Sequence, residues 1–283
     1  MHRTNKWIWL LILGMLLTVP TAPLAAADGA AAEQTITAAQ ADAERQELAD
    51  RIAQFKAQMA ERETEIPPAE AVYMGREVAR TMHWRGAEWL TRPTRQREEN
   101  TALLMKVLDP QPGMVVCDLG AGNGYYTLKL SDALEDRGTV IAQDLQPEML
   151  ELLEERAELH GAHDNLIYLT GSYINPMLPR ESCDLVLLVD VYHEFSHPVH
   201  MLRRIREALK PGGRLVLVEF RGEDNTVPIR PEHKMTKDQI RLELNANGFE
   251  VADEFDELPW QHVMSFTRDE DWEYVEPGER AAE

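Results

Sequence analysis

A short glycine-rich segment constrains the fold of this chain more than any other feature. An apolar run that begins at Val115 ends in the acid Asp118 and passes at once into Gly120, Gly122 and Gly124, which stand on alternate positions. The run of β-formers indicates a buried strand, and the glycines indicate a tight turn. Apolar side chains then recur at Tyr126, Leu128, Leu130 and Leu134. The pattern predicts a strand, a turn and a helix, with a turn whose backbone a ligand can approach closely.

The spacing of the glycines separates two classes of ligand. The dinucleotide fingerprint is G-x-G-x-x-G/A, whereas this chain reads G-x-G-x-G and has Tyr125 at the sixth position. Asp118 lies two residues before the first glycine, where a carboxylate repels a pyrophosphate but suits a ligand with an ammonium group. S-adenosylmethionine (SAM) is such a ligand, because it carries a sulfonium, an α-amino group and no phosphate. The alternative is a turn kept only for packing.

A second acid supports a nucleoside ligand. The next expected strand, residues 139–143, ends at Asp144, 24 positions after Gly120. An acid at about this distance can accept hydrogen bonds from the ribose hydroxyls. Asp144 alone also fits a helix cap, since Pro147 and Glu148 follow it. With the glycine turn upstream, we expect it to bind the ribose.

Over roughly residues 95–267 the chain resembles the class I SAM-dependent methyltransferases, in particular the group that includes quinone-biosynthesis and small-molecule methyltransferases. The resemblance is carried by residues 118–124, Asp144, the expected strand at 185–190 and the Leu-Lys-Pro-Gly-Gly turn at 209–213. It implies an α/β, Rossmann-like fold: a seven-stranded sheet of order 3-2-1-4-5-7-6, with the last strand antiparallel and helices on both faces. It also implies a small-molecule methyl acceptor.

The resemblance implies SAM as the cofactor and gives candidate residues for binding it. After strand three the family often has an acid near the adenine amino group, whereas this chain has Gly171-Ser172-Tyr173, so Ser172 is the candidate there. The cofactor-binding candidates are Asp118, Gly120, Ala121, Gly122, Gly124, Asp144, Leu145, Ser172 and Asp190.

The rest of the chain alternates strands and helices, which indicates a parallel sheet covered on both faces. Helices are expected near 147–160, 198–209 and 236–247, and strands near 166–170, 184–190, 214–220, 249–255 and 262–267. Ligands of such sheets bind beyond the carboxyl ends of the strands. Strand four ends next to Tyr192 and His193, and strand five ends next to Glu219, so these three are the catalytic candidates.

Methyl transfer depends largely on holding the acceptor in line with an already activated methyl group. A hydroxyl acceptor also needs a general base, and His193 or Glu219 would serve. A carbon or amine acceptor needs only orientation, for which Tyr192 and Glu194 are candidates; His193 equally fits a structural role. Trp84 and Trp89 precede the core, in a segment that family relatives often use as a lid over the substrate.

His193-Glu194-Phe195-Ser196-His197 matches H-E-x-x-H, the pattern of zinc metallopeptidases. Zinc binding through that motif requires both histidines on one face of one helix. Pro198 disfavours helical geometry at His197, and a strand runs directly into His193. We therefore expect no metal site, and keep the metallopeptidase and a non-catalytic SAM- or nucleoside-binding module as alternatives to the methyltransferase.

The N-terminal segment has the pattern of a secretory signal peptide. Basic residues precede an apolar run from Trp7 to Val19, and small residues at 25–27 offer a cleavage site. We expect residues 1–27 to be removed and the protein to be periplasmic, without a stable membrane span after cleavage; an uncleaved anchor is the alternative. Residues 28–69 then form a linker or helix, 70–268 the methyltransferase domain with an N-terminal helical lid, and 269–283 an acidic tail.

The formal net charge of −20 argues against a nucleic-acid partner. Arg92, Arg95 and Arg97 form a local basic patch, which we interpret as the polar face of a helix. Cys117 and Cys183 fall on neighbouring strands, offset by about four positions, too far apart for a disulfide. The oligomeric state is left open.

Overall fold

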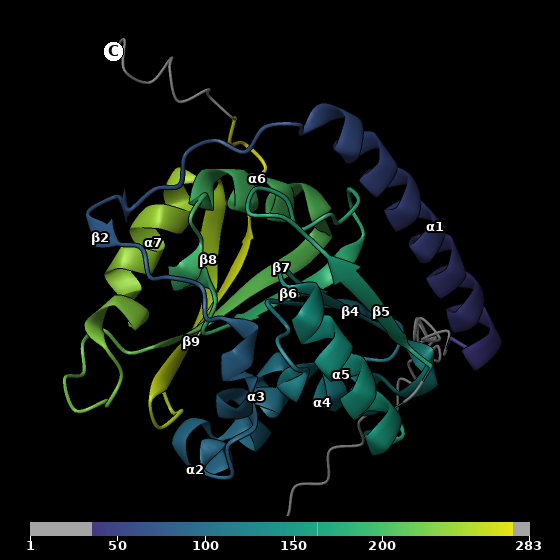
Figure 1. Ribbon diagram of the computed structural model, residues 1–283, viewed down its shortest axis with the longest axis horizontal. Helices are drawn as coiled ribbons and strands as arrows, with labels where there is room; N and C mark the ends of the chain where they lie inside the picture. Colours follow the sequence, from purple (N-terminus) through teal and green to yellow (C-terminus); the bar gives the residue numbers. More distant parts are fainter. Residues whose placement is uncertain (1–35, 163, 274–283) are drawn as a thin grey trace, which may run out of the picture. The chain divides into compact units, whose positions relative to one another are not determined.

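The computed structural model describes residues 36–162 and 164–273, and its core is a seven-stranded sheet of order β5-β4-β3-β6-β7-β9-β8 (Figure 1). Neighbouring strands from β5 to β7 are parallel, and β9 is antiparallel to both β7 and β8. The strands are β3 (Val115–Leu119), β4 (Thr139–Asp144), β5 (Leu166–Thr170), β6 (Cys183–Val189), β7 (Leu209–Phe220), β8 (Phe249–Phe255) and β9 (Gln261–Arg268). This confirms the order and orientations expected from the sequence.

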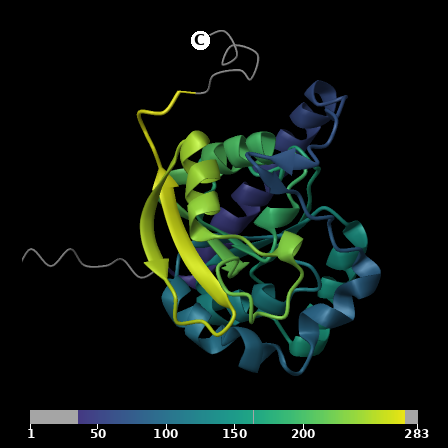
Figure 2. The ribbon, with the colours of Figure 1, turned by 90° about the vertical axis from the view of Figure 1, so that its left-hand side faces the viewer.

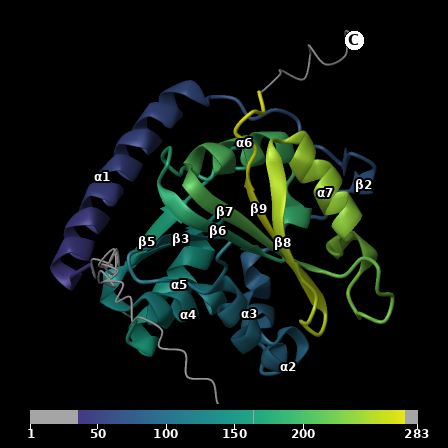
Figure 3. The same ribbon diagram turned by 180° about the vertical axis from the view of Figure 1, so that it is seen from behind.

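Helices cover both faces of the sheet, because alternate strand residues point to opposite sides. Cys117 packs in a core shared with α1, α6 and α7, whereas Val116 packs in a core shared with α3 and α4. Figures 1 and 3 show these helices from opposite sides. Figure 2 shows the β8–β9 hairpin at the edge of the sheet. The α-helices are α1 (Ala38–Arg62), α2 (Arg95–Glu99), α3 (Thr101–Leu108), α4 (Tyr125–Leu134), α5 (Pro147–His160), α6 (Pro198–Ala208) and α7 (Lys237–Ala246).

The segment expected to be a linker or helix contains the long helix α1. A capping box between Thr37 and Gln40 begins it. Its apolar stripe is buried at Leu48, Ile52 and Met59, and the first two join the core that contains α6 and α7. The described residues form one compact unit, so α1 is part of the packed domain.

The structure differs from the sequence expectation in the start of one strand and in one additional hairpin. Strand β7 begins at Leu209, five residues earlier than expected, because Leu209 pairs with Cys183 before a register shift. A small hairpin of β1 (Val72–Tyr73) and β2 (Arg76–Glu77) precedes the core and was not expected. Short 3-10 helices fill the connections: η1 (Trp84–Thr91), η2 (Glu135–Arg137), η3 (Tyr192–Glu194) and η4 (Pro231–His233).

The expected signal peptide, residues 1–27, and the end of the acidic tail lie outside the described residues. Within 36–162 and 164–273, no helix combines the length and apolar character needed to cross a bilayer. Cys117 and Cys183 are both free and buried. Cys117 pairs with Val186, so the two cysteines are offset by three positions instead of four.

Candidate active site

A cavity of about 520 Å³ opens at the carboxyl ends of the parallel strands. This volume lies within the range typical of small-molecule sites, about 300–1,000 Å³. Of the residues expected from the sequence, its wall contains Gly120, Gly122, Asp144, Leu145, Ser172, Asp190 and His193. The strand order therefore brings candidates from four different loops to one site.

The glycine turn is shaped by its neighbours in space. All three glycines have positive φ angles, between 55° and 82°, which glycine adopts without strain. The amides of Gly120 and Ala121 donate to the Gln143 carbonyl at 2.8 and 2.9 Å, which ties the turn to β4. A Cβ on Gly124 would lie 2.5 Å from Leu153 of α5, so that glycine serves helix packing. Gly124 and Ala121 are not on the cavity wall.

Asp144 is fixed at the end of β4 by backbone donors. Its carboxylate accepts from the Gly122 and Gln146 amides, each at 2.9 Å. Burial raises the pKa of Asp144, and these hydrogen bonds oppose the rise. Each carboxylate oxygen retains accepting capacity. An oriented acid beside Gly120 and Gly122, which have no side chains to block a ligand, fits the ribose of SAM.

Asp118 lies beneath the turn, off the cavity wall. It is 3% exposed and accepts a hydrogen bond from the Thr127 hydroxyl at 2.6 Å. Burial raises the pKa of Asp118 to about 6. The contact between Asp118 and the ligand's ammonium group stays a prediction.

His193 lies on another part of the cavity wall and is held by a partner on β7. Its Nδ1 lies 2.6 Å from Glu219 Oε2, and both side chains are buried. Burial favours the neutral imidazole, but the charge and hydrogen bond of Glu219 act against it and leave the pKa of His193 above its ordinary value. Glu219 also accepts from the Tyr192 amide at 2.9 Å. Glu219 is off the cavity wall and positions His193 from behind.

The Tyr192 side chain points away from the cavity. This placement does not support the catalytic role expected of it from the sequence. Its hydroxyl donates to Glu243 Oε2 at 2.6 Å, and Arg76 lies over its ring at 5.4 Å. Glu243 also pairs with Arg76 at 2.7 Å. The side chain belongs to a buried polar group that joins α7 to the β1–β2 hairpin.

The H-E-x-x-H match does not form a zincin helix. Helix η3 ends at Glu194, and α6 begins only at Pro198, as the proline predicted. His197 Nε2 lies 2.8 Å from the Pro67 carbonyl, and its Nδ1 lies 3.0 Å from the Ser196 hydroxyl. His197 is therefore not paired with His193 for metal binding.

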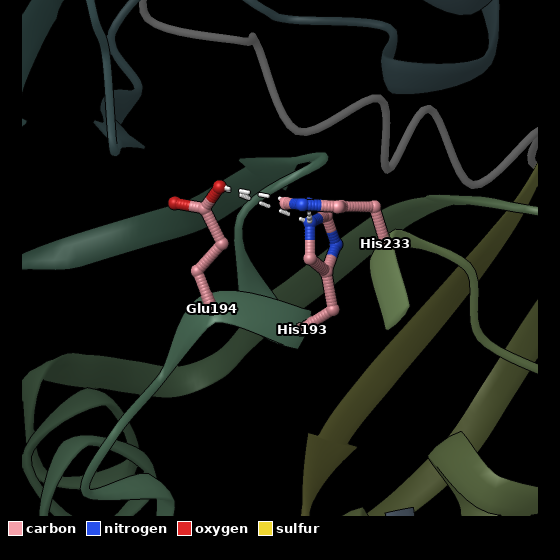
Figure 4. Close-up of side chains that lie close together, drawn as sticks. All are labelled: His193, Glu194 and His233. Carbon is pink, nitrogen blue, oxygen red and sulfur yellow. Dashed lines mark hydrogen bonds and ion pairs between the residues drawn. The ribbon is translucent and has the colours of Figure 1, made fainter. Parts of the chain in front are cut away.

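His193 instead lies against His233, a residue that no sequence pattern indicated. His193 Nε2 lies 3.1 Å from His233 Nδ1, and Glu194 faces both rings (Figure 4). Burial raises the pKa of Glu194 to about 7, and His193 opposes the rise. His233 lies in η4, and no local motif marks it.

The segment before the core lines the cavity, as expected of a lid, although its closure stays a prediction. Trp89, Leu90 and Arg92 contribute to the wall, whereas Trp84 does not. The interpretation of the basic patch as the polar face of a helix is wrong for Arg92 and Arg95. Both line the cavity and pair with Glu99 at 2.7 Å.

The sheet order is that of a Rossmann-like methyltransferase fold. Residues 110–270, more than half of the chain, match the family described as "Methyltransferase domain", and the chain belongs to that family. A SAM-dependent methyltransferase from Aquifex aeolicus has the same fold, with a TM-score of 0.62 and 23% identity, over 66% of this chain and 98% of that one.

Two relatives share the name ubiquinone/menaquinone biosynthesis C-methyltransferase UbiE. The protein from Shewanella frigidimarina is 29% identical over 41% of this chain and 46% of its own length. The protein from Shewanella baltica is 26% identical over 57% of this chain and 60% of its own length. The match thus spans about half the length of these curated relatives.

Proposed function

We propose that this chain transfers a methyl group from SAM to a small acceptor with a substantial apolar surface. The observation that carries the proposal is one cavity that joins the glycine turn and Asp144 to the buried His193–Glu219 pair. Bound SAM supplies an activated methyl group on a sulfonium. The chain's own residues then bind the nucleoside, orient the acceptor and hold a proton.

The cavity wall indicates the character of the acceptor. Met82, Trp89, Leu90, Phe195 and Phe220 line it, and such side chains favour aromatic or aliphatic groups. The relatives named for quinone biosynthesis support quinol-type compounds as the first acceptors to test. His193 faces the same cavity with its Nδ1 held by Glu219, which suits it to accept a proton from a hydroxyl acceptor.

Calorimetric titration with SAM and S-adenosylhomocysteine tests the cofactor site. Asp144→Ala is expected to weaken SAM binding by about 1–3 kcal/mol through loss of a hydrogen-bond acceptor. Asp132→Ala, at an exposed position on α4, is the matched control and should leave binding unchanged. Unchanged affinity in the Asp144 variant would remove that residue from the site.

Methyl transfer itself is tested with SAM labelled in the methyl group and a panel of quinols and phenols. Label in the acceptor, dependent on the folded protein, is the expected result. SAM binding without transfer to any acceptor would instead favour a non-catalytic SAM-binding module.

We also propose that residues 1–27 are an export signal and that the mature protein acts in the periplasm. The support is the order of basic residues, apolar run and small residues at the N-terminus. Sequencing the N-terminus of protein from the native envelope fraction should give a start near Asp28. A chain that still starts at Met1 would favour an uncleaved anchor.

A further inference from the structure

Three side chains with metal-binding atoms converge on the cavity wall. They are His193 and Glu194 of η3 and His233 of η4, and their ligand atoms all lie within 4.8 Å of one another. His193 Nε2 and His233 Nδ1 are 3.1 Å apart, and Glu194 Oε1 lies 4.0 and 3.9 Å from them. Figure 4 shows the carboxylate facing both rings.

Two of the three groups are held in an orientation that leaves a ligand atom directed at the cluster. His193 Nδ1 is bound to Glu219, which leaves Nε2 facing His233. The Met82 amide donates to Glu194 Oε2 at 3.2 Å, which leaves Oε1 toward the rings. Carboxylates and backbone groups behind the ligands are the usual support of metal sites.

We propose that His193 Nε2, His233 Nδ1 and Glu194 Oε1 bind a zinc ion. Zinc–nitrogen bonds of 2.0–2.1 Å place tetrahedral ligand atoms about 3.3 Å apart. The two ring nitrogens already meet this spacing, and Glu194 Oε1 needs to approach by about 0.6 Å, within the reach of a side-chain rotation. Two imidazoles and one carboxylate favour zinc over magnesium or calcium, which prefer oxygen ligands.

Zinc binding would have to displace the Arg230 side chain from His233. Its Nη2 lies 3.0 Å from His233 Nε2, and a metal bound at Nδ1 leaves the His233 proton on that Nε2. Two donors would then face each other. The Arg230 side chain is 75% exposed and pairs with Glu232 at 3.3 Å, so it has room to turn aside.

The three ligands leave a fourth zinc position, as in catalytic zinc sites. All three ligand residues line the same cavity, so this position opens into it. It fits an acceptor that offers an oxygen or sulfur atom. Zinc binding itself does not depend on the proposed function, whereas this role toward the acceptor rests on it. With Glu219 on Nδ1 and zinc on Nε2, both nitrogens of His193 are occupied. His193 therefore accepts a proton from the acceptor only in the zinc-free protein, and in the zinc-bound protein the metal contacts the acceptor atom.

The test is titration of the mature protein with zinc alone, after treatment with a chelator and dialysis. Competition with a chromophoric chelator should give one zinc per chain, and magnesium in excess should not displace it. His233→Ala and Glu194→Gln should each weaken zinc affinity at least about tenfold, and Glu219→Gln about 10–100-fold, the range for residues behind a ligand. Cobalt(II) in place of zinc should give a visible spectrum that the His233 variant loses.

Two control variants separate this site from other zinc binding. His160→Ala removes an exposed histidine that pairs with Asp132 on α4, and His197→Ala removes the second histidine of H-E-x-x-H. Both should retain zinc affinity. Loss in His197→Ala but not in His233→Ala would overturn the assignment in favour of the zincin motif.

Circular dichroism and thermal unfolding check that every variant folds. The His233 side chain is 20% exposed, more than that of Glu194 or His193, so its variant is expected to be the least disruptive. Absence of stoichiometric zinc binding by the wild type, or equal affinity in the folded His233 and Glu194 variants, would overturn the proposal. SAM titration of the zinc-free protein keeps the two proposals apart: SAM binding without zinc binding removes the metal site alone.

Discussion

At the scale of single residues, the carboxyl groups around the cavity have different hydrogen-bond partners, which influence whether each is charged. Asp144 is held by two backbone amides, and Glu219 by His193 and the Tyr192 amide. Asp190 contacts the Gln261 side-chain amide at 2.9 Å, and burial raises its pKa well above the ordinary value. Burial favours the neutral form of a carboxyl group, and donors and positive neighbours favour the charged form.

Asp118 gives a prediction for stability against pH. Burial raises its pKa to about 6 in the folded state, above the ordinary 3.8. The unfolded chain therefore loses this proton first as pH rises. The free energy of unfolding then falls between about pH 4 and pH 6 and stays at the lower value above pH 6. Asp118→Asn removes the titration and keeps an acceptor for Thr127. The free energy of unfolding of the variant, relative to that of the wild type, should rise by up to about 3 kcal/mol between pH 4 and pH 8.

Urea unfolding at pH 4, 6 and 8 measures this gain. A constant offset between Asp118→Asn and wild type would reflect other effects of the amide, so the change with pH is the quantity of interest. A difference that does not vary with pH would contradict the raised pKa.

At the scale of elements, η1 packs directly on the glycine turn. A Cβ on Gly122 would lie 2.5 Å from Leu90 Cδ1, and Gly122 has a φ of 55°. Leu90 also lines the cavity. The turn therefore needs glycine both for its backbone conformation and for its contact with the segment over the site.

Gly122→Ala is expected to lower the free energy of unfolding by about 1–3 kcal/mol, the range for a strained positive φ, with a further loss from the contact with Leu90. Adding Leu90→Ala should relieve the steric part. A double-mutant cycle in urea measures this coupling. If the losses in free energy of unfolding of the two single variants simply add in the double variant, Leu90 can move away from residue 122 at no cost and η1 is not packed on the turn.

The buried face of helix α1 is expected to contribute to the stability of the domain. Ile52 is 5% exposed and belongs to the main core. Ile52→Ala should cost about 2–5 kcal/mol, the range for a buried large-to-small change. Gln54→Ala, exposed on the same helix, should change stability little. Equal urea midpoints for both variants would show that α1 does not stabilise the domain.

At the scale of the whole molecule, the sheet order creates the site and also separates the cysteines. Cys117 and Cys183 lie on neighbouring parallel strands three positions out of register, about 10 Å along the strand. A disulfide requires Cα atoms within about 7 Å. Burial raises the pKa of Cys117 well above its ordinary value and that of Cys183 to about 12.

Both thiols should therefore remain free and unreactive in the folded protein, even under oxidising conditions. Titration with a chromogenic thiol reagent, without reductant, should find almost no reaction before denaturation and two thiols per chain after it. Fewer than two thiols after denaturation would point to a bridge and contradict the register of β3 and β6.

The sequence alone determined the features that depend on short stretches of chain. The glycine turn, the acid at the end of β4 and helix α5 follow from local backbone preferences and from the spacing of apolar residues, which act over a few positions. The resemblance carried by these motifs implied the sheet order that the structure confirms. That sheet order brings seven of the expected site residues to one cavity.

Only the tertiary structure decided where the side chains around His193 point. Tyr192 adjoins His193 in the chain, yet it turns to Glu243 because α7 and the β1–β2 hairpin offer a buried acid and Arg76 there. His233 lies 40 residues from His193 and reaches it through a loop whose course no local pattern records. Arg95 is buried because Glu99 neutralises it inside the cavity wall. Side-chain direction and loop return depend on which distant partners packing supplies, and this information is spread over the whole chain.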